Sequence, residues 1–169
     1  FPQVTITPSP TANPTADWKT YKNTKFGFTL QYPKSWRVID YTENRDNNHE
    51  VLFMGDENSQ QQLRILIEEN PNDLTLNNWL EKNRPFFLKN RTPENISIDT
   101  IPGLKSETEG VGYESGIKTY DDTSYITYNH FVYGFYFETK NQKINSELNS
   151  QILSTFKFID QKLSTKLRI

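Results

Sequence analysis

The sequence contains no cysteine, only two histidines and one methionine, and no long run of apolar residues. The absence of cysteine excludes disulfide scaffolds, thiolate zinc sites and cysteine nucleophiles, but it leaves the compartment open because a cysteine-free chain tolerates either redox state. No apolar run approaches the length of about 20 residues with which a helix crosses a bilayer. Net positive charge is also lacking, since 19 Lys and Arg oppose 21 Asp and Glu. The chain therefore has no overall positive field to attract nucleic acid.

Aromatic residues are what the sequence has in excess. It contains 11 Phe, 9 Tyr and 3 Trp, although hydrophobic residues of all kinds make up only 34% of its 169 residues. The aromatic side chains supply the apolar area that such a polar composition otherwise lacks. A chain of this length can bury one core of ordinary size, so we expect one globular domain.

Residues 1–17 are rich in proline and threonine, with four of each. Proline fixes φ and removes a backbone donor, so we expect an extended, polyproline-like tether that reaches about 3 Å per residue. Such a spacer commonly separates a secretory signal, lipid anchor or membrane helix from a folded extracytoplasmic domain. The sequence therefore predicts a disordered tether at 1–17, a folded domain at 18–160 and a charged tail at 161–169. The full-length protein is then expected to be extracytoplasmic, in the periplasm or at the cell surface. It is expected to be membrane-bound only through an N-terminal anchor missing from this sequence. The alternative is that residues 1–17 are a disordered extension without a role.

Apolar residues alternate with polar ones in the first half of the folded domain. Phe26, Phe28, Leu30 and Tyr32 fall at every second position, which predicts a half-buried strand that ends at a turn around Pro33. Further strands are expected at 36–42, 51–54 and 63–68, with a loop at 43–48 and a hairpin connection at 55–58. The N-terminal half is therefore predicted to be an antiparallel meander.

The spacing of apolar residues then changes from that of a strand to that of a helix. Leu76, Trp79 and Leu80 predict a helix over 75–84, capped by Thr75 or Asp73 and interrupted near residue 85. Short strands are expected on either side of a break at 101–103, followed by a turn-rich surface excursion at 113–122. Two strands lie within 125–137, joined somewhere between 129 and 134, and a helix near 146–155 closes the domain.

Both ends of the span 18–159 carry motifs of a known family. Near the start, Phe-Gly-Phe at 26–28 is followed by Tyr-Pro at 32–33 and then Trp36. Near the end, Ser-Thr-Phe-Lys at 154–157 follows an apolar helix. In order and spacing, these segments resemble the opening strand and the terminal helix and strand of PsbP-related domains. The middle of the chain carries no motif that matches the family.

This resemblance implies an α+β fold, an α/β/α sandwich on a central antiparallel sheet. The family includes the photosystem II subunit PsbP, a yeast Ran-binding protein and many bacterial envelope lipoproteins, and the members characterised best bind other proteins and are not enzymes. The matched positions are core and turn residues, so the resemblance implies a fold and transfers no active site.

Catalytic and metal-binding motifs are scarce. Neither His49 nor His130 lies in a Gly-x-Ser-x-Gly nucleophile elbow, so nothing marks a Ser–His–Asp triad. His49 adjoins Glu50, and acidic residues at 121–122 precede His130, but no ligand spacing such as paired histidines at i and i+4 is present. We therefore predict no catalytic residue, no cofactor and no metal ligand, with a weakly held divalent cation as the alternative.

The stretch 125–137 has large apolar residues at both odd and even positions, so both faces of its strands are apolar. The favoured interpretation is that helices cover both faces of the sheet. The alternative is an exposed aromatic patch that binds a partner protein or a glycan. The candidate residues for this patch are Tyr113, Tyr120, Tyr125, Tyr128, Tyr133 and Tyr136.

From these observations we predict a non-catalytic, PsbP-like extracytoplasmic domain that acts as a protein-interaction or assembly module, with no nucleic-acid partner. One alternative is a ligand-capture domain for a small molecule, a hydrophobic peptide or a divalent cation, which a concave pocket lined by aromatics from 125–137 would favour. A second alternative is a hydrolase, which a buried histidine bonded to both a serine and an aspartate would favour.

Overall fold

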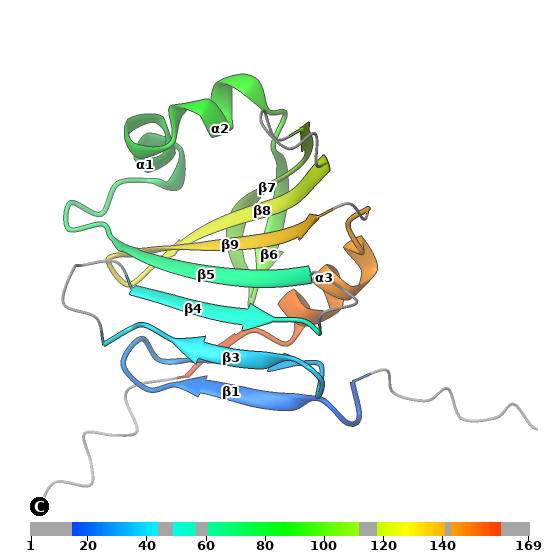
Figure 1. Ribbon diagram of the computed structural model, residues 1–169. Helices are drawn as coiled ribbons and strands as arrows, with labels where there is room; N and C mark the ends of the chain where they lie inside the picture. The colour runs from blue at the N-terminus through cyan, green and yellow to red at the C-terminus, as the bar shows by residue number, and fades with distance from the viewer. Residues whose placement is uncertain (1–14, 44–48, 57–60, 112–117, 141–142, 160–169) are drawn as a thin grey trace, which may run out of the picture.

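The computed structural model of the protein describes residues 15–43, 49–56, 61–111, 118–140 and 143–159 (Figure 1). Within these residues the fold is a sheet-dominated α+β fold with two antiparallel sheets. In order across the larger sheet, its strands are β3 (Arg37–Asp40), β4 (His49–Met54), β5 (Gln61–Glu69), β9 (Phe131–Lys140), β8 (Lys118–Tyr128), β7 (Ile101–Val111) and β6 (Glu94–Ile98). The smaller sheet has the order β1 (Lys19–Asn23), β2 (Phe28–Tyr32) and β10 (Lys157–Phe158). The helices are α1 (Leu76–Asn83), α2 (Pro85–Asn90) and α3 (Ser146–Ser154).

The prediction of one N-terminal meander is only partly confirmed. β3, β4 and β5 are consecutive in the larger sheet, as expected. β2, however, pairs with β1 and with the C-terminal strand β10, so it belongs to the second sheet. β1 was missed because its sequence lacks an alternation of large apolar residues, and its pairing with β2 holds it in the strand conformation.

Two predicted turns were also placed wrongly. β7 runs through residues 101–103, and the chain reverses instead at Asp99 and Thr100, which have φ values of 47° and 68°. Pro102 is tolerated because it pairs only with β6, since the register with β8 begins at Gly103. Residues 118–122, expected in a surface excursion, belong to β8. The preceding residues 112–117 lie outside the described part of the chain.

The predicted helices and the central hairpin are confirmed. The Thr75 hydroxyl accepts a hydrogen bond from the backbone N–H of Asn78 and caps α1, and α2 begins at Pro85. β8 and β9 are joined by the two-residue turn of Asn129 and His130, both with positive φ, as a tight hairpin requires.

One face of the larger sheet is covered by the smaller sheet and by α3 (Figure 1). The core between them is aromatic, and Phe156 lies at its centre. Its ring stacks on Phe28 of β2 at a centroid distance of 5.1 Å and meets Phe135 of β9 edge-on at 5.1 Å. The segment after α3 therefore joins the two sheets.

The opposite face is covered only in part. Trp79, Leu80 and Phe87 of α1 and α2 pack on Tyr125 of β8 and Val132 of β9. Figure 1 shows these two helices over one end of the face, while no element that the structure describes covers the strands toward β3. This face of the larger sheet therefore has a second, smaller core and an open area of strands beside it.

A side-chain contact links β1 of the smaller sheet to β3. The Asp40 carboxylate accepts hydrogen bonds from the Tyr21 hydroxyl at 2.5 Å and from the backbone N–H and hydroxyl of Thr42 at 2.8 and 2.6 Å. Burial alone would raise the pKa of Asp40, but these hydrogen bonds and the charge of Lys25 outweigh it and lower the pKa below its usual value. The ionised carboxylate is therefore the form that holds the two strands together.

Asp40→Asn is expected to lower the free energy of unfolding near neutral pH by about 1 kcal/mol, because a partly exposed charged hydrogen-bond acceptor is lost. A pKa lowered by folding gives stability that is present above the unfolded-state pKa and lost as the pH falls through the folded-state pKa. The difference between wild type and variant should therefore close below about pH 4 in urea titrations followed by tryptophan fluorescence. Glu43→Gln, in an exposed and looser pair with Lys25 at 3.9 Å, is the control and should have little effect at either pH. A difference that persists at low pH would contradict the assignment.

Candidate binding groove

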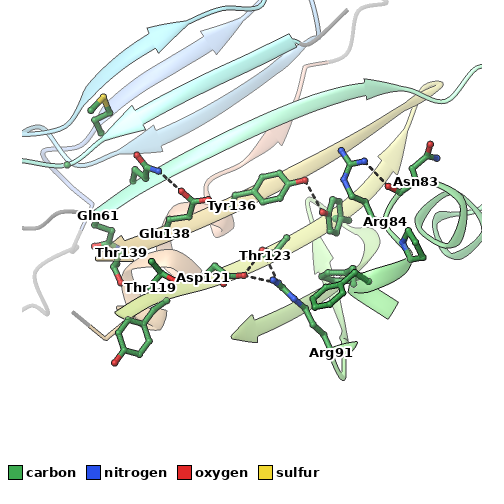
Figure 2. Close-up of a pocket in the computed structure, with 18 of the residues that line it drawn as sticks. Gln61, Asn83, Arg84, Arg91, Thr119, Asp121, Thr123, Tyr136, Glu138 and Thr139 are labelled. Carbon is green, nitrogen blue, oxygen red and sulfur yellow. Dashed lines mark hydrogen bonds and ion pairs between the residues drawn. The ribbon is translucent and has the colours of Figure 1, made fainter. Parts of the chain in front are cut away.

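A groove of about 1040 Å³ lies on the open part of the larger sheet, beside α1 and α2 (Figure 2). Its floor is the sheet and its wall is the segment from the end of α1 through α2. The main lining residues are Arg37, Met54, Gln62, Arg84, Phe86, Arg91, Asp121, Thr123, Tyr125, Tyr136 and Glu138.

The strand register explains how the floor is built. Side chains directly opposite one another in neighbouring antiparallel strands lie on the same face of a sheet. One such row runs across five strands, through Arg37, Met54, Gln62, Glu138 and Asp121. With strands about 4.8 Å apart, its four spacings span about 19 Å. The groove is therefore elongated, and its long direction crosses the strands.

A second row of side chains on the same face contains Tyr136 of β9, which is the aromatic centre of the groove. Its hydroxyl lies 2.8 Å from that of Tyr125, and the two rings meet edge-on with centroids 5.7 Å apart. Burial raises the pKa of Tyr125, and the neighbouring Tyr136 hydroxyl adds to this, so the Tyr125 hydroxyl stays protonated at physiological pH. Gly134 provides the space for this pair, because a Cβ there would lie 2.7 Å from Cε2 of Tyr136.

Three arginines around this centre are each paired with a carboxylate. The pairs are Arg64 with Glu138 at 3.3 Å, Arg84 with Glu68 at 2.8 Å and Arg91 with Asp121 at 2.8 Å. The Arg64 guanidinium also lies over the Tyr136 ring, 5.0 Å from its centroid. Figure 2 shows Arg84 and Arg91 at the right of the view, with Glu138 and Asp121 on the strands to their left. These ion pairs hold the polar side chains in place, and they leave the groove lined by both hydrogen-bond donors and acceptors.

The wall carries an exposed aromatic side chain. Phe86 of α2 is 64% exposed and lines the groove, next to the buried Phe87 that anchors the helix on Tyr125 at 4.9 Å. A large apolar side chain held at the edge of a groove by a packed helix is typical of binding sites.

The six tyrosines predicted to form one surface are not brought together. Tyr125 and Tyr136 line the groove. Tyr128 and Tyr133 lie on the opposite face, where Tyr128 stacks on Phe158 at 3.9 Å and Tyr133 is buried in the core. Tyr120 lies at the far end of β8, where it also lines the groove although its register places it on the core-facing side. Tyr113 lies outside the described residues.

Two of these tyrosines are almost fully buried. Tyr133 is 1% exposed, and Tyr125 is 3% exposed with its hydroxyl at the groove floor. The candidate set combined tyrosines from odd and even positions, which point to opposite faces of one strand. The two-residue turn at Asn129 and His130 changes the parity, so Tyr125 shares a face with Gly134 and Tyr136 and not with Tyr133.

The histidines do not meet the criterion set for a hydrolase. His130 is exposed and pairs with Asp73 at 2.7 Å, and Nδ1 of His49 lies 2.9 Å from the carbonyl oxygen of Thr42. Among the described residues, no three histidine or acidic side chains are grouped so as to hold a metal ion. In the same part of the chain, no helix is long and apolar enough to cross a membrane.

Sequence analysis missed most of the residues that define the groove. Arg37, Arg64 and Arg91 look like ordinary solvated charges in strands and helix ends, and Phe86 looks like a core residue. The only available signal was the pair Tyr125 and Tyr136, which lie within the aromatic stretch. Their arginine and carboxylate neighbours come from other strands, and their positions depend on a register that the sequence does not state.

Known proteins share the fold of this chain. A crystal structure from Bacteroides thetaiotaomicron matches 85% of the chain at 14% identity with a TM-score of 0.62, and the chain spans about half (49%) of that protein. Cyanobacterial PsbP from Synechocystis matches 89% of the chain and 98% of its own length, at 18% identity with a TM-score of 0.57. The Ran-binding protein Mog1p of Saccharomyces cerevisiae matches 87% of the chain and 98% of its own length, at 11% identity with a TM-score of 0.52.

These similarities confirm the predicted resemblance to PsbP and to the yeast Ran-binding protein at the level of the fold. No protein-family model matches the sequence, and no curated protein matches it either. At identities this low a shared fold does not carry a function, so the groove has to be interpreted from its own residues.

Proposed function

We propose that this chain is a non-catalytic binding domain of a bacterial envelope protein, and that it binds a segment of a partner protein in the groove. The observation that carries the proposal is the elongated groove with the exposed Phe86 on its wall and the Tyr125–Tyr136 pair on its floor. Exposed aromatic residues beside buried ones are the usual anchors of protein interfaces. The fold supports a binding role, since one protein that shares it is named as Ran-binding.

The setting we propose is extracytoplasmic, with the Thr/Pro-rich segment 1–17 as a tether to a membrane anchor. Its composition supports a spacer that holds the domain away from a membrane surface. We also propose that the layers of helix, sheet and helix form the α/β/α sandwich of PsbP-like domains. α1 and α2 on one face of the larger sheet, and α3 on the other, support this arrangement.

A second candidate function is the capture of a small ligand in the same groove. The concavity and the two tyrosines from 125–137 favour it. The volume of about 1040 Å³, however, lies at the upper limit of the range of roughly 300–1,000 Å³ typical of small-molecule pockets. Its extension across five strands favours a longer ligand.

Random short peptides displayed on phage, selected against the full chain, provide the test. Selected peptides are expected to lose at least tenfold in affinity for Phe86→Ala, because an aromatic anchor at an interface contributes more than about 1.4 kcal/mol. Fluorescence anisotropy with the synthetic peptides measures this loss. Phe86 is exposed, so its removal should leave the free energy of unfolding nearly unchanged.

Tyr41→Ala is the matched control, since Tyr41 is the other exposed large hydrophobic side chain among the described residues and does not line the groove. It should bind the selected peptides as the wild type does. Equal losses for both variants, or no peptide that depends on Phe86, would contradict the proposal. A saturable rise in melting temperature with a metabolite, oligosaccharide or divalent cation, in place of peptide binding, would support ligand capture instead.

A further inference from the structure

Arg37 differs from the three arginines around the Tyr125–Tyr136 pair. Arg64, Arg84 and Arg91 each form an ion pair with a carboxylate, as described above. Arg37 lies on β3, its side chain is exposed, and no carboxylate pairs with it among the residues that the structure describes. Asp56, the other charged residue at this end, already has an interaction of its own. One end of the groove therefore presents a positive charge that is still available.

The two ends of the groove differ in chemistry. α2 lies over β8, because Phe87 packs on Tyr125, so the exposed Phe86 marks the β8 end. Arg37 marks the β3 end, and the row that starts there reaches Asp121 of β8 after about 19 Å, while Phe87 packs on Tyr125, four residues further along β8. Between the ends, Glu138 and Asp121 are already neutralised by their arginines. A ligand that complements this surface is apolar at one end, neutral in the middle and negative at the other end.

We propose that the occupant is an extended polypeptide segment with an apolar or aromatic side chain against Phe86 and a carboxylate at Arg37. An extended chain rises about 3.3 Å per residue, so the span of about 19 Å across the sheet requires at least roughly six residues between the two groups. The neutral middle of the segment lies over Gln62 and Tyr136, where side chains offer both donors and acceptors. This inference rests on the proposed function, because it specifies the partner of the same groove.

The experiment compares the peptides selected by three forms of the full chain: wild type, Arg37→Glu and Lys22→Glu. Lys22 is an exposed residue of β1 in the other sheet, so its reversal changes the net charge equally without touching the groove. Wild type and Lys22→Glu are expected to select an acidic residue at a constant distance of at least about six residues from an apolar one. Arg37→Glu is expected to select Lys or Arg at that position.

Affinities of one selected peptide then measure the contact directly. Exchanging its acidic residue for Lys should weaken binding to the wild type by about two- to fivefold, which is the range of an exposed ion pair, and Arg37→Glu should restore it. Peptides that need Phe86 but bind wild type and Arg37→Glu equally would overturn this inference and leave the proposed function standing. The absence of any Phe86-dependent peptide would overturn both.

Discussion

Asp122→Ala is expected to lower the free energy of unfolding by about 3–5 kcal/mol, because it removes one partner from a buried charged network. Asp122 of β8 is fully buried on the core-facing side of the sheet. Its Oδ2 accepts a hydrogen bond from the side-chain amide of Asn149 of α3 at 3.0 Å and pairs with Lys105 of β7 at 3.3 Å. The Asn149 carbonyl oxygen in turn accepts a bond from Gln61 of β5 at 2.9 Å.

Loss of the Asp122 carboxylate leaves two donors without this acceptor. The Asn149 amide is fully buried, and the Lys105 side chain is 13% exposed, with Glu107 at 3.0 Å as its remaining partner. Unsatisfied groups of this kind carry the full penalty of their lost hydration. Because Asn149 connects α3 to β5 and β8, we expect the docking of this helix to weaken first.

Urea denaturation followed by circular dichroism measures the effect. Glu107→Ala is the matched control, since it removes the other partner of Lys105 from an exposed position and should change stability by less than about 1 kcal/mol. A loss for Asp122→Ala as small as that of the control would contradict the assignment of the network.

The pH dependence of a second variant tests the charge itself. Burial raises the pKa of Asp122, although Asn149 and Lys105 oppose this. A pKa raised by folding means that the contribution of the group to stability is largest below the unfolded-state pKa and declines as the pH rises through the folded-state pKa. Asp122→Asn keeps the shape of the side chain and cannot ionise. Its loss of unfolding free energy relative to the wild type should therefore be smallest at pH values above the folded-state pKa of Asp122.

Phe156→Ala is expected to lower the free energy of unfolding by about 3–5 kcal/mol, the usual effect of removing a fully buried phenylalanine. Phe156 contacts the rings of Phe28, Phe135 and Phe158, all with centroids between 5.0 and 5.1 Å away. These partners come from both sheets, so the cavity lies at the junction between them. The transition midpoint in urea measures the loss.

Phe86→Ala serves as the control for Phe156→Ala, because it removes the same side chain from an exposed position and should stay within about 0.5 kcal/mol of the wild type. The two variants also separate folding from binding. Phe156 lies on the face opposite the groove, so folded Phe156→Ala protein should still bind selected peptides. A core variant that abolished peptide binding while folded would place the binding site elsewhere.

Local signals made much of the fold predictable. The alternation that predicted a strand at 26–32, observed over Phe28–Tyr32, the cap at Thr75 and the turn residues near 129 each depend on contacts within a few residues. The pairing of β2 with β1 and β10 was not predictable in this way. β10 lies more than a hundred residues from β2, and the choice between two sheets depends on which face packs against Phe156.

The candidate site shows the same division. The sequence by itself determined that the stretch 125–137 is aromatic on both faces and that the chain lacks the motifs of a metal or catalytic site. Only the tertiary structure decided which tyrosines share a face, since one two-residue turn changes the parity between β8 and β9. It also decided that Arg37 lies in one row with Glu138 and Asp121. The physical reason is that a row across a sheet depends on strand order and register, which are set by pairing between distant segments and by the burial of one face.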